Sequence, residues 1–172
     1  MKSRNKRAFW TALGSRLLDG NESTDTADLP VEMKEALALP LKAPEVSTVV
    51  RGEDLEGKRG RNIYMYTWKI LRELGFSRPL RCEVFPGIEL FLPFVKGTVT
   101  VLPQGFQKRI PLSLRAYALV GKNAALRAKG FHLVIVAAIF DETTWDTLKQ
   151  GGCRVCTPDK LEQLLTALDL PQ

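Results

Sequence analysis

The residues from 101 to 130 carry six cationic side chains and no acidic one, a segment whose composition suggests a chemical role. A second cluster, Lys58, Arg59 and Arg61, lies in a glycine-punctuated loop, residues 51–61, that could hold a phosphate. Acid-free cationic segments are typical of surfaces that contact nucleic-acid phosphates. The same pattern also fits a solvated helix face, and that alternative stays open. The six cations of the segment are Lys108, Arg109, Arg115, Lys122, Arg127 and Lys129.

Metal-binding and nucleophilic motifs are sparse. Cys153 and Cys156 have metal-ligand spacing, and with Cys82 and His132 they could form a zinc site. However, two cysteines three residues apart on a strand point to opposite faces, so the pattern favours free, buried thiols. The sequence has no phosphate-binding loop of the GK[ST] type, no HExxH and no Gly-x-Ser-x-Gly. It therefore predicts no resident metal or cofactor.

The order of predicted elements defines the fold class. Three short apolar runs, 80–85, 88–94 and 98–102, are separated by glycine and proline and predict three strands. A helix predicted at 113–129 follows, and then an apolar run, 133–140, predicts a buried strand. With a helix at 62–74 in front, the order is αβββαβ. We expect an α/β protein in which 80–85, 88–94, 98–102 and 133–139 share one mixed central sheet flanked by helices.

This order resembles the restriction-endonuclease-like PD-(D/E)XK superfamily, closest to its very-short-patch-repair and RAP-domain branches. The resemblance covers roughly residues 62–168, including a "strand, then Trp, then Leu" ending at 140–148. Two groups of residues carry it. One is Glu89-Leu90-Phe91-Leu92-Pro93, Val99–Val101 and Gly105-Phe106; the other is Lys122-Asn123, Leu126, Gly130-Phe131 and Leu133–Val136.

The resemblance also implies what a catalytic site would need. Such nucleases hold Mg²⁺ with an acid on the second strand and an acid-x-Lys on the third, whose lysine positions the attacking water. Glu89 occupies the first of these places, but the third run, 98–102, carries no acid. The resemblance therefore implies a nuclease-like fold with an incomplete metal site and no enzymatic activity. The alternative is a nuclease that uses Glu89 as a catalytic metal ligand, with Mg²⁺ as its only cofactor.

The chain divides into an arm and a domain. Residues 1–48 are expected to form a basic N-terminal helical arm with an acidic linker, and residues 49–172 the restriction-endonuclease-like α/β domain. Residues 1–18 place Phe9, Trp10, Leu13 and Leu17 near helical spacing, so this helix could dock on a protein partner or on the body of the protein. After the central unit, we expect a helix at 141–150, a strand at 153–156 and a helix at 159–168.

Composition limits the class of protein. The 172 residues carry a net charge of +6 and are 45% hydrophobic, which is enough for a core. No apolar run approaches the roughly 18 residues that span a bilayer, and the N-terminus lacks the apolar region of a secretory signal. Three cysteines, an odd number, fit a reducing compartment. We therefore expect a cytoplasmic protein without a membrane partner.

The leading hypothesis is a nucleic-acid-binding or complex-forming protein whose nine named cations contact phosphates without reading sequence. A second alternative, besides the nuclease, is a scaffold or inhibitor that binds a protein partner through residues 1–18.

Overall fold

The computed structural model describes residues 3–19, 28–39, 49–50, 61–76, 79–104, 112–137 and 142–168. Within these ranges, no helix is both long enough and apolar enough to cross a membrane. The elements in chain order are α1 (Ser3–Asp19), α2 (Val31–Ala38), β1 (Val49–Val50), α3 (Arg61–Glu73), β2 (Leu80–Phe85), β3 (Ile88–Leu92), β4 (Phe94–Lys96), β5 (Val99–Gln104), α4 (Leu112–Ala128), β6 (His132–Ala137), α5 (Glu142–Gln150), β7 (Arg154–Cys156), a 3₁₀ turn (Pro158–Lys160) and α6 (Leu161–Ala167).

A five-stranded mixed sheet forms the centre of the protein, with strand order β1-β7-β6-β5-β4. Strands β1, β7, β6 and β5 run parallel, and β4 pairs antiparallel with β5. Helix α4 is the crossover that returns the chain from β5 to the parallel strand β6, as parallel pairing requires. The expected α/β class with a mixed sheet is therefore confirmed.

The expectation of a single sheet is wrong for the first two strands. Strands β2 and β3 pair only with each other in the described structure and form a separate antiparallel hairpin. The predicted run 88–94 is divided at Pro93, so that Leu92 pairs with Leu80 whereas Phe94 pairs with Val101. Proline has no amide hydrogen and cannot continue a hydrogen-bonded ladder, which explains the division at this residue. The elements follow the predicted order along the chain without forming the predicted four-stranded core.

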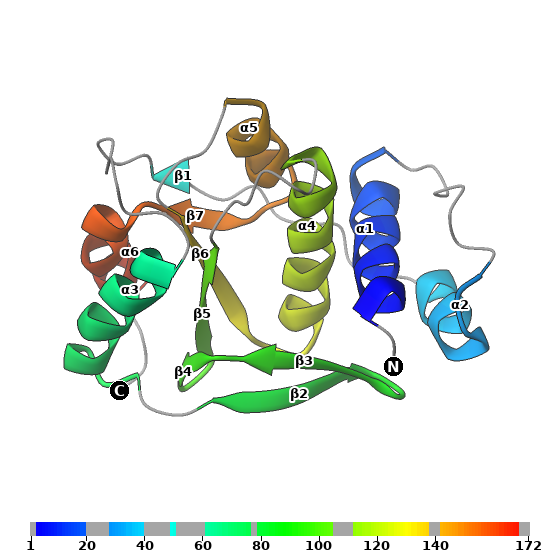
Figure 1. Cartoon of the computed structure of the whole chain (residues 1–172), viewed down its shortest axis with the longest axis horizontal. Helices are drawn as coiled ribbons and strands as arrows, with labels where there is room; N and C mark the ends of the chain where they lie inside the picture. Colours follow the sequence, from blue (N-terminus) through cyan, green and yellow to red (C-terminus); the bar gives the residue numbers. More distant parts are fainter. Residues whose placement is uncertain are drawn as a thin grey trace.

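Helices cover both faces of the sheet (Figure 1). One apolar core lies between the sheet, the β2–β3 hairpin and helices α1, α2, α4 and α5. The other lies between the sheet, α3 and α6. Strand β6 supplies both: Leu133 and Ile135 face the first core, and Val134 and Val136 face the second. A continuous apolar run, rather than an alternating one, is what a strand buried on both faces requires.

Helix α1 docks on the body of the protein and lies beside α4 (Figure 1). Its Phe9, Trp10 and Leu13 are buried in the first core. The ring of Phe9 meets that of Phe85, on the hairpin, edge to face at a centroid distance of 5.7 Å. Since these apolar side chains are covered by the chain itself, they are not free to bind a protein partner. Of the two roles that the sequence left open for this helix, docking of its apolar face on the body of the protein is observed. Binding of a protein partner through residues 1–18 stays a prediction.

Two glycines allow α1 and α4 to touch backbone to backbone. A Cβ on Gly14 of α1 would lie 1.7 Å from the carbonyl oxygen of Tyr117 on α4. A Cβ on Gly121 of α4 would lie 2.6 Å from the carbonyl oxygen of Trp10. Both distances are far inside van der Waals contact, so any side chain at either position would push the helices apart. Tyr117 lies on α4 one turn before Gly121, and its side chain forms a hydrogen bond with Asp19 at the end of α1. The pKa of Tyr117 is raised, chiefly by burial and then by the carboxylate of Asp19.

We expect Gly14→Ala and Gly121→Ala each to lower the free energy of unfolding by about 1–3 kcal/mol, the usual effect of overpacking. At an exposed helix position the same change would stabilise the helix by about 1 kcal/mol. Close helix contact and an open helix surface therefore predict changes of opposite sign in the free energy of unfolding. Urea unfolding measures the difference, with Ser15→Ala on α1 as the matched control. Stabilisation by either glycine substitution would show that the helices are not in close contact.

Candidate functional site

A cavity of about 380 Å³ lies between α1, α4, β3 and the end of β5. Its volume falls in the range of small-molecule sites, about 300–1,000 Å³. Four of its lining side chains are cationic and one is acidic, while the rest are mostly apolar. The cations are Lys6, Arg7, Arg115 and Lys122; the acid is Glu89; the other lining residues are Trp10, Leu90, Phe91, Gln104, Ala118 and Leu119.

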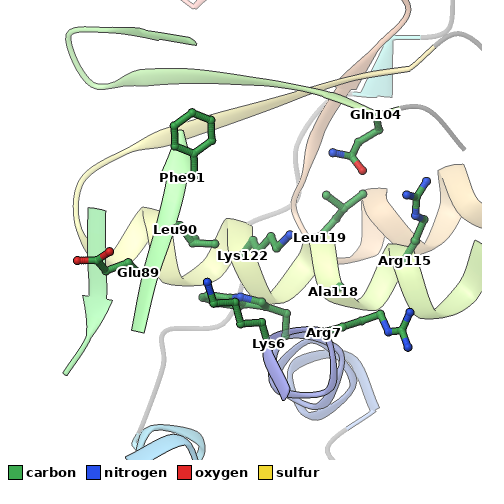
Figure 2. Close-up of a pocket in the computed structure, with 11 residues that line it drawn as sticks. Lys6, Arg7, Glu89, Leu90, Phe91, Gln104, Arg115, Ala118, Leu119 and Lys122 are labelled. Carbon is green, nitrogen blue, oxygen red and sulfur yellow. The ribbon is translucent and has the colours of Figure 1, made fainter. Parts of the chain in front are cut away.

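Helix periodicity brings the four cations to the cavity from two helices. Arg115 and Lys122 are seven residues apart on α4, two turns along one face. Lys6 and Arg7 precede the buried Trp10 by four and three residues, so all three share one side of α1. Figure 2 shows Lys122 in the middle of the site, with Lys6 and Arg7 on one side and Phe91 and Gln104 on the other. The close helix contact therefore places both pairs of cations around one cavity.

Strand β5 supplies the neutral side of the cavity. Thr100 and Leu102 face α4 and line a smaller cavity of about 40 Å³ together with Lys122. Gln104, two residues further on, ends β5 and reaches the larger cavity. The Oγ1 atom of Thr100 is fully buried and has no hydrogen-bond partner in the described structure. Thus the polar groups that β5 presents to the two cavities are a hydroxyl and an amide, both neutral.

Lys122 is the most constrained of the four cations. It is half-buried, and its pKa is lowered, chiefly by desolvation and then by the positive charge of Arg115. Desolvation also lowers the pKa of Arg115. A cation held out of water beside another cation is unfavourable unless an anion comes close to both. The electrostatics of this end of the cavity therefore favour an anionic ligand.

Within the part of the chain that the structure describes, Glu89 is not joined by other candidate metal ligands into a group that could hold an ion. Its side chain is 54% exposed, and its carboxylate lies 4.0 Å from the guanidinium of Arg81. In Figure 2 this carboxylate points away from Lys122. Two other acids are elsewhere: Glu83 accepts a hydrogen bond from the amide of Gly87 in the hairpin turn, and Glu73 ends α3 across the sheet. Across the described ranges, no three His, Cys, Asp or Glu side chains come together as metal ligands would.

Of the other predicted phosphate-binding residues, the two whose side chains are described, Arg127 and Lys129, do not line the cavity. Arg127 lies near Cys153 and His132. Its charge partly opposes the burial that raises the pKa of the Cys153 thiol, and it is the smallest cause of the lowered pKa of His132, after desolvation and Arg154. Lys129 is exposed in the turn after α4. Arg61 begins α3, the helix on the opposite face of the sheet, and its side chain lies outside the described part. Lys58, Arg59, Lys108 and Arg109 also lie outside the described residues.

Sequence reasoning missed two groups of lining residues. Lys6 and Arg7 were predicted to belong to an N-terminal arm. Because they lie beside the apolar face of α1, they come to the cavity when that face packs on α4. Phe91 is 58% exposed and lies on the open face of β3, between the buried Leu90 and Leu92. Its position was readable from the alternation of the strand, but the cavity beside it depends on tertiary packing.

The cysteines occupy opposite faces of the sheet, as predicted. Cys153 belongs to the core under α4 and α5, and Cys156 to the core under α3 and α6. Burial raises the pKa of each thiol to about 12. His132 is exposed, and its Nδ1 lies 3.1 Å from the guanidinium of Arg154. Its pKa is lowered by desolvation first and then by Arg154 and Arg127. These groups cannot share one zinc ion, because the sheet separates the two thiols.

We expect Lys122→Met to raise the free energy of unfolding at pH 7, because it keeps the packed stem and removes an unfavourably placed charge. The folded-state pKa of Lys122 lies below its usual value of 10.5, so the folded protein loses this proton first as the pH rises. The advantage of the Met variant should therefore persist below the folded-state pKa and shrink as the pH rises from there toward 10.5. Urea unfolding between pH 6 and 10.5 tests this, with the exposed Lys149→Met as control. Destabilisation by Lys122→Met at every pH would refute the electrostatic interpretation.

The geometry describes a concave, predominantly cationic site with an apolar floor and one outward-facing carboxylate. Such a site can hold a phosphate or another anion attached to an apolar or aromatic group. No family model matches this chain, and neither the curated proteins nor the solved structures provide a match.

Proposed function

We propose that this protein binds nucleic acid, and that the cationic cavity between α1 and α4 contacts the phosphates. The observation that supports this most directly is the convergence of Lys6 and Arg7 with Arg115 and Lys122 around one cavity. Phosphate contacts supply most of the affinity of such proteins and carry no sequence information. The binding should therefore be strong at low salt and indifferent to sequence.

Two further observations support nucleic acid over a small inorganic anion. The cavity has an aromatic ring at its rim, Phe91, which an inorganic anion would not use. The whole chain is basic, with a net charge of +6, which favours a polyanionic partner. A nuclease-like fold without a complete metal site is part of the proposal. The chain order α3, β2, β3, β4, β5, α4, β6 supports it, although β2 and β3 form a hairpin separate from the central sheet.

We expect Arg115→Gln and Lys122→Gln each to weaken binding and to reduce the slope of log K against log[salt]. Each lost phosphate contact should change that slope by about 0.7 for a single strand or 0.9 for duplex DNA. Fluorescence anisotropy at several salt concentrations measures both quantities, and Lys149→Gln on α5 is the matched charge control. A slope unchanged in the Arg115 and Lys122 variants would show that these cations face solvent only.

A second candidate, a Mg²⁺-dependent nuclease, is favoured by one observation: Glu89, Gln104 and Lys122 line the same cavity. One carboxylate and one amide are a weak ligand set for a dication that prefers anionic oxygens. We therefore expect no metal-dependent cleavage of single-stranded, duplex or branched substrates. Titration of Mg²⁺ and Mn²⁺ with the wild type and Glu89→Ala tests this. Cleavage by the wild type that is lost in Glu89→Ala would replace the binding proposal with the nuclease.

A further inference from the structure

We propose that the cavity receives one nucleotide of an unpaired strand, with its base stacked on Phe91 and its phosphate directed toward Arg115 and Lys122. This inference rests on the proposed function and names the form of nucleic acid that the site takes.

Phe91 is placed as a platform rather than as a core residue. Along β3, the side chains of Ile88, Leu90 and Leu92 are buried, whereas Glu89 and Phe91 lie on the exposed face. The backbone beneath the ring is held by pairing with β2, where Arg81 is the cross-strand partner of Phe91. An isolated exposed aromatic ring needs no explanation, but this ring borders a cavity with four cations. Aromatic rings beside a cationic groove are the usual means of binding single strands.

The cavity is divided in a way that matches the parts of a nucleotide. Its floor is apolar and is formed by Leu90 and Trp10 with Ala118 and Leu119 of α4. Lys122 crosses the middle, and Arg115 and Glu89 lie at opposite ends (Figure 2). An anion is therefore attracted to the end with Arg115 and is repelled from the end with Glu89. A base above Phe91 and a phosphate near Arg115 satisfy both constraints.

The requirement for an unpaired strand follows from what a duplex exposes. In a duplex both faces of each base are stacked on its neighbours, and only base edges are accessible in the grooves. A ring such as Phe91 needs a free face, so duplex DNA cannot stack on it without being opened. The cavity also has the volume of a small-molecule site rather than of a groove that holds a double helix.

The test uses the full-length chain with a labelled single-stranded oligonucleotide and with the blunt-ended duplex that the same strand forms with its complement. We expect Phe91→Ala and Phe91→Leu each to raise the Kd for the single strand by about 5- to 150-fold, the range for loss of one stacked base. Phe91→Trp should retain wild-type affinity. The slope of log K against log[salt] should not change in any Phe91 variant, because no phosphate contact is lost. Trp68→Leu, which removes a partly exposed aromatic ring of α3 on the other face of the sheet, is the matched control.

A second readout detects the stacking itself. A strand that contains 2-aminopurine should lose fluorescence on binding the wild type and recover it with Phe91→Leu, a variant that keeps an apolar side chain at an exposed position. If the wild type binds single strands but the Phe91 variants bind them equally well, the stacking inference is wrong and the proposed function stands. If the wild type binds duplex as tightly as single strand, the unpaired-strand requirement is wrong. If the wild type binds neither, the proposed function fails together with this inference.

Discussion

The candidate site depends on the direct backbone contact between α1 and α4. Because Gly14 and Gly121 leave no side chain between the helices, the backbone of α1 around Trp10 and Gly14 is held against that of α4 around Tyr117 and Gly121. Lys6 and Arg7 thereby join Arg115 and Lys122, although more than one hundred residues separate the two pairs. The hairpin completes the arrangement, since Phe85 packs on the aromatic rings of α1 while β3 lines the cavity.

This arrangement places like charges together, so its stability must come from elsewhere. Full burial of one large apolar side chain contributes about 1.5–3 kcal/mol, and α1 buries Phe9, Trp10 and Leu13 in the core. That contribution opposes the repulsion among the partly solvated cations, which water and salt also screen. The pKa of Lys122 is lowered by its desolvation first and then by repulsion from Arg115. Titratable groups with perturbed pKa values are typical of binding sites, where a ligand of opposite charge stabilises the charged form.

Local periodicity was sufficient to predict most elements. Helix 113–129 is observed as α4 (Leu112–Ala128), and helix 62–74 as α3 (Arg61–Glu73). Both could be predicted because the apolar face and the ends of a helix are determined by residues close together in the sequence. The separation of the hairpin was missed because one proline inside an apolar run can end a strand or occupy its edge. Part of the site was predicted through Arg115, Lys122 and Glu89. Lys6, Arg7 and Phe91 were not, since a sequence shows which face of a helix is apolar but not which helix will cover it.

The balance of charge around the cavity also bears on the choice between a binding protein and a nuclease. A dication requires a negative field, which carboxylates on adjacent strands would supply. Here the α4-facing side of β5 offers Thr100 and Gln104, both neutral, and the cations opposite would repel a dication. The carboxylate of Glu89 is turned toward Arg81 and does little to reverse that field. The same field attracts phosphate, which supports the proposed binding of a strand at this cavity.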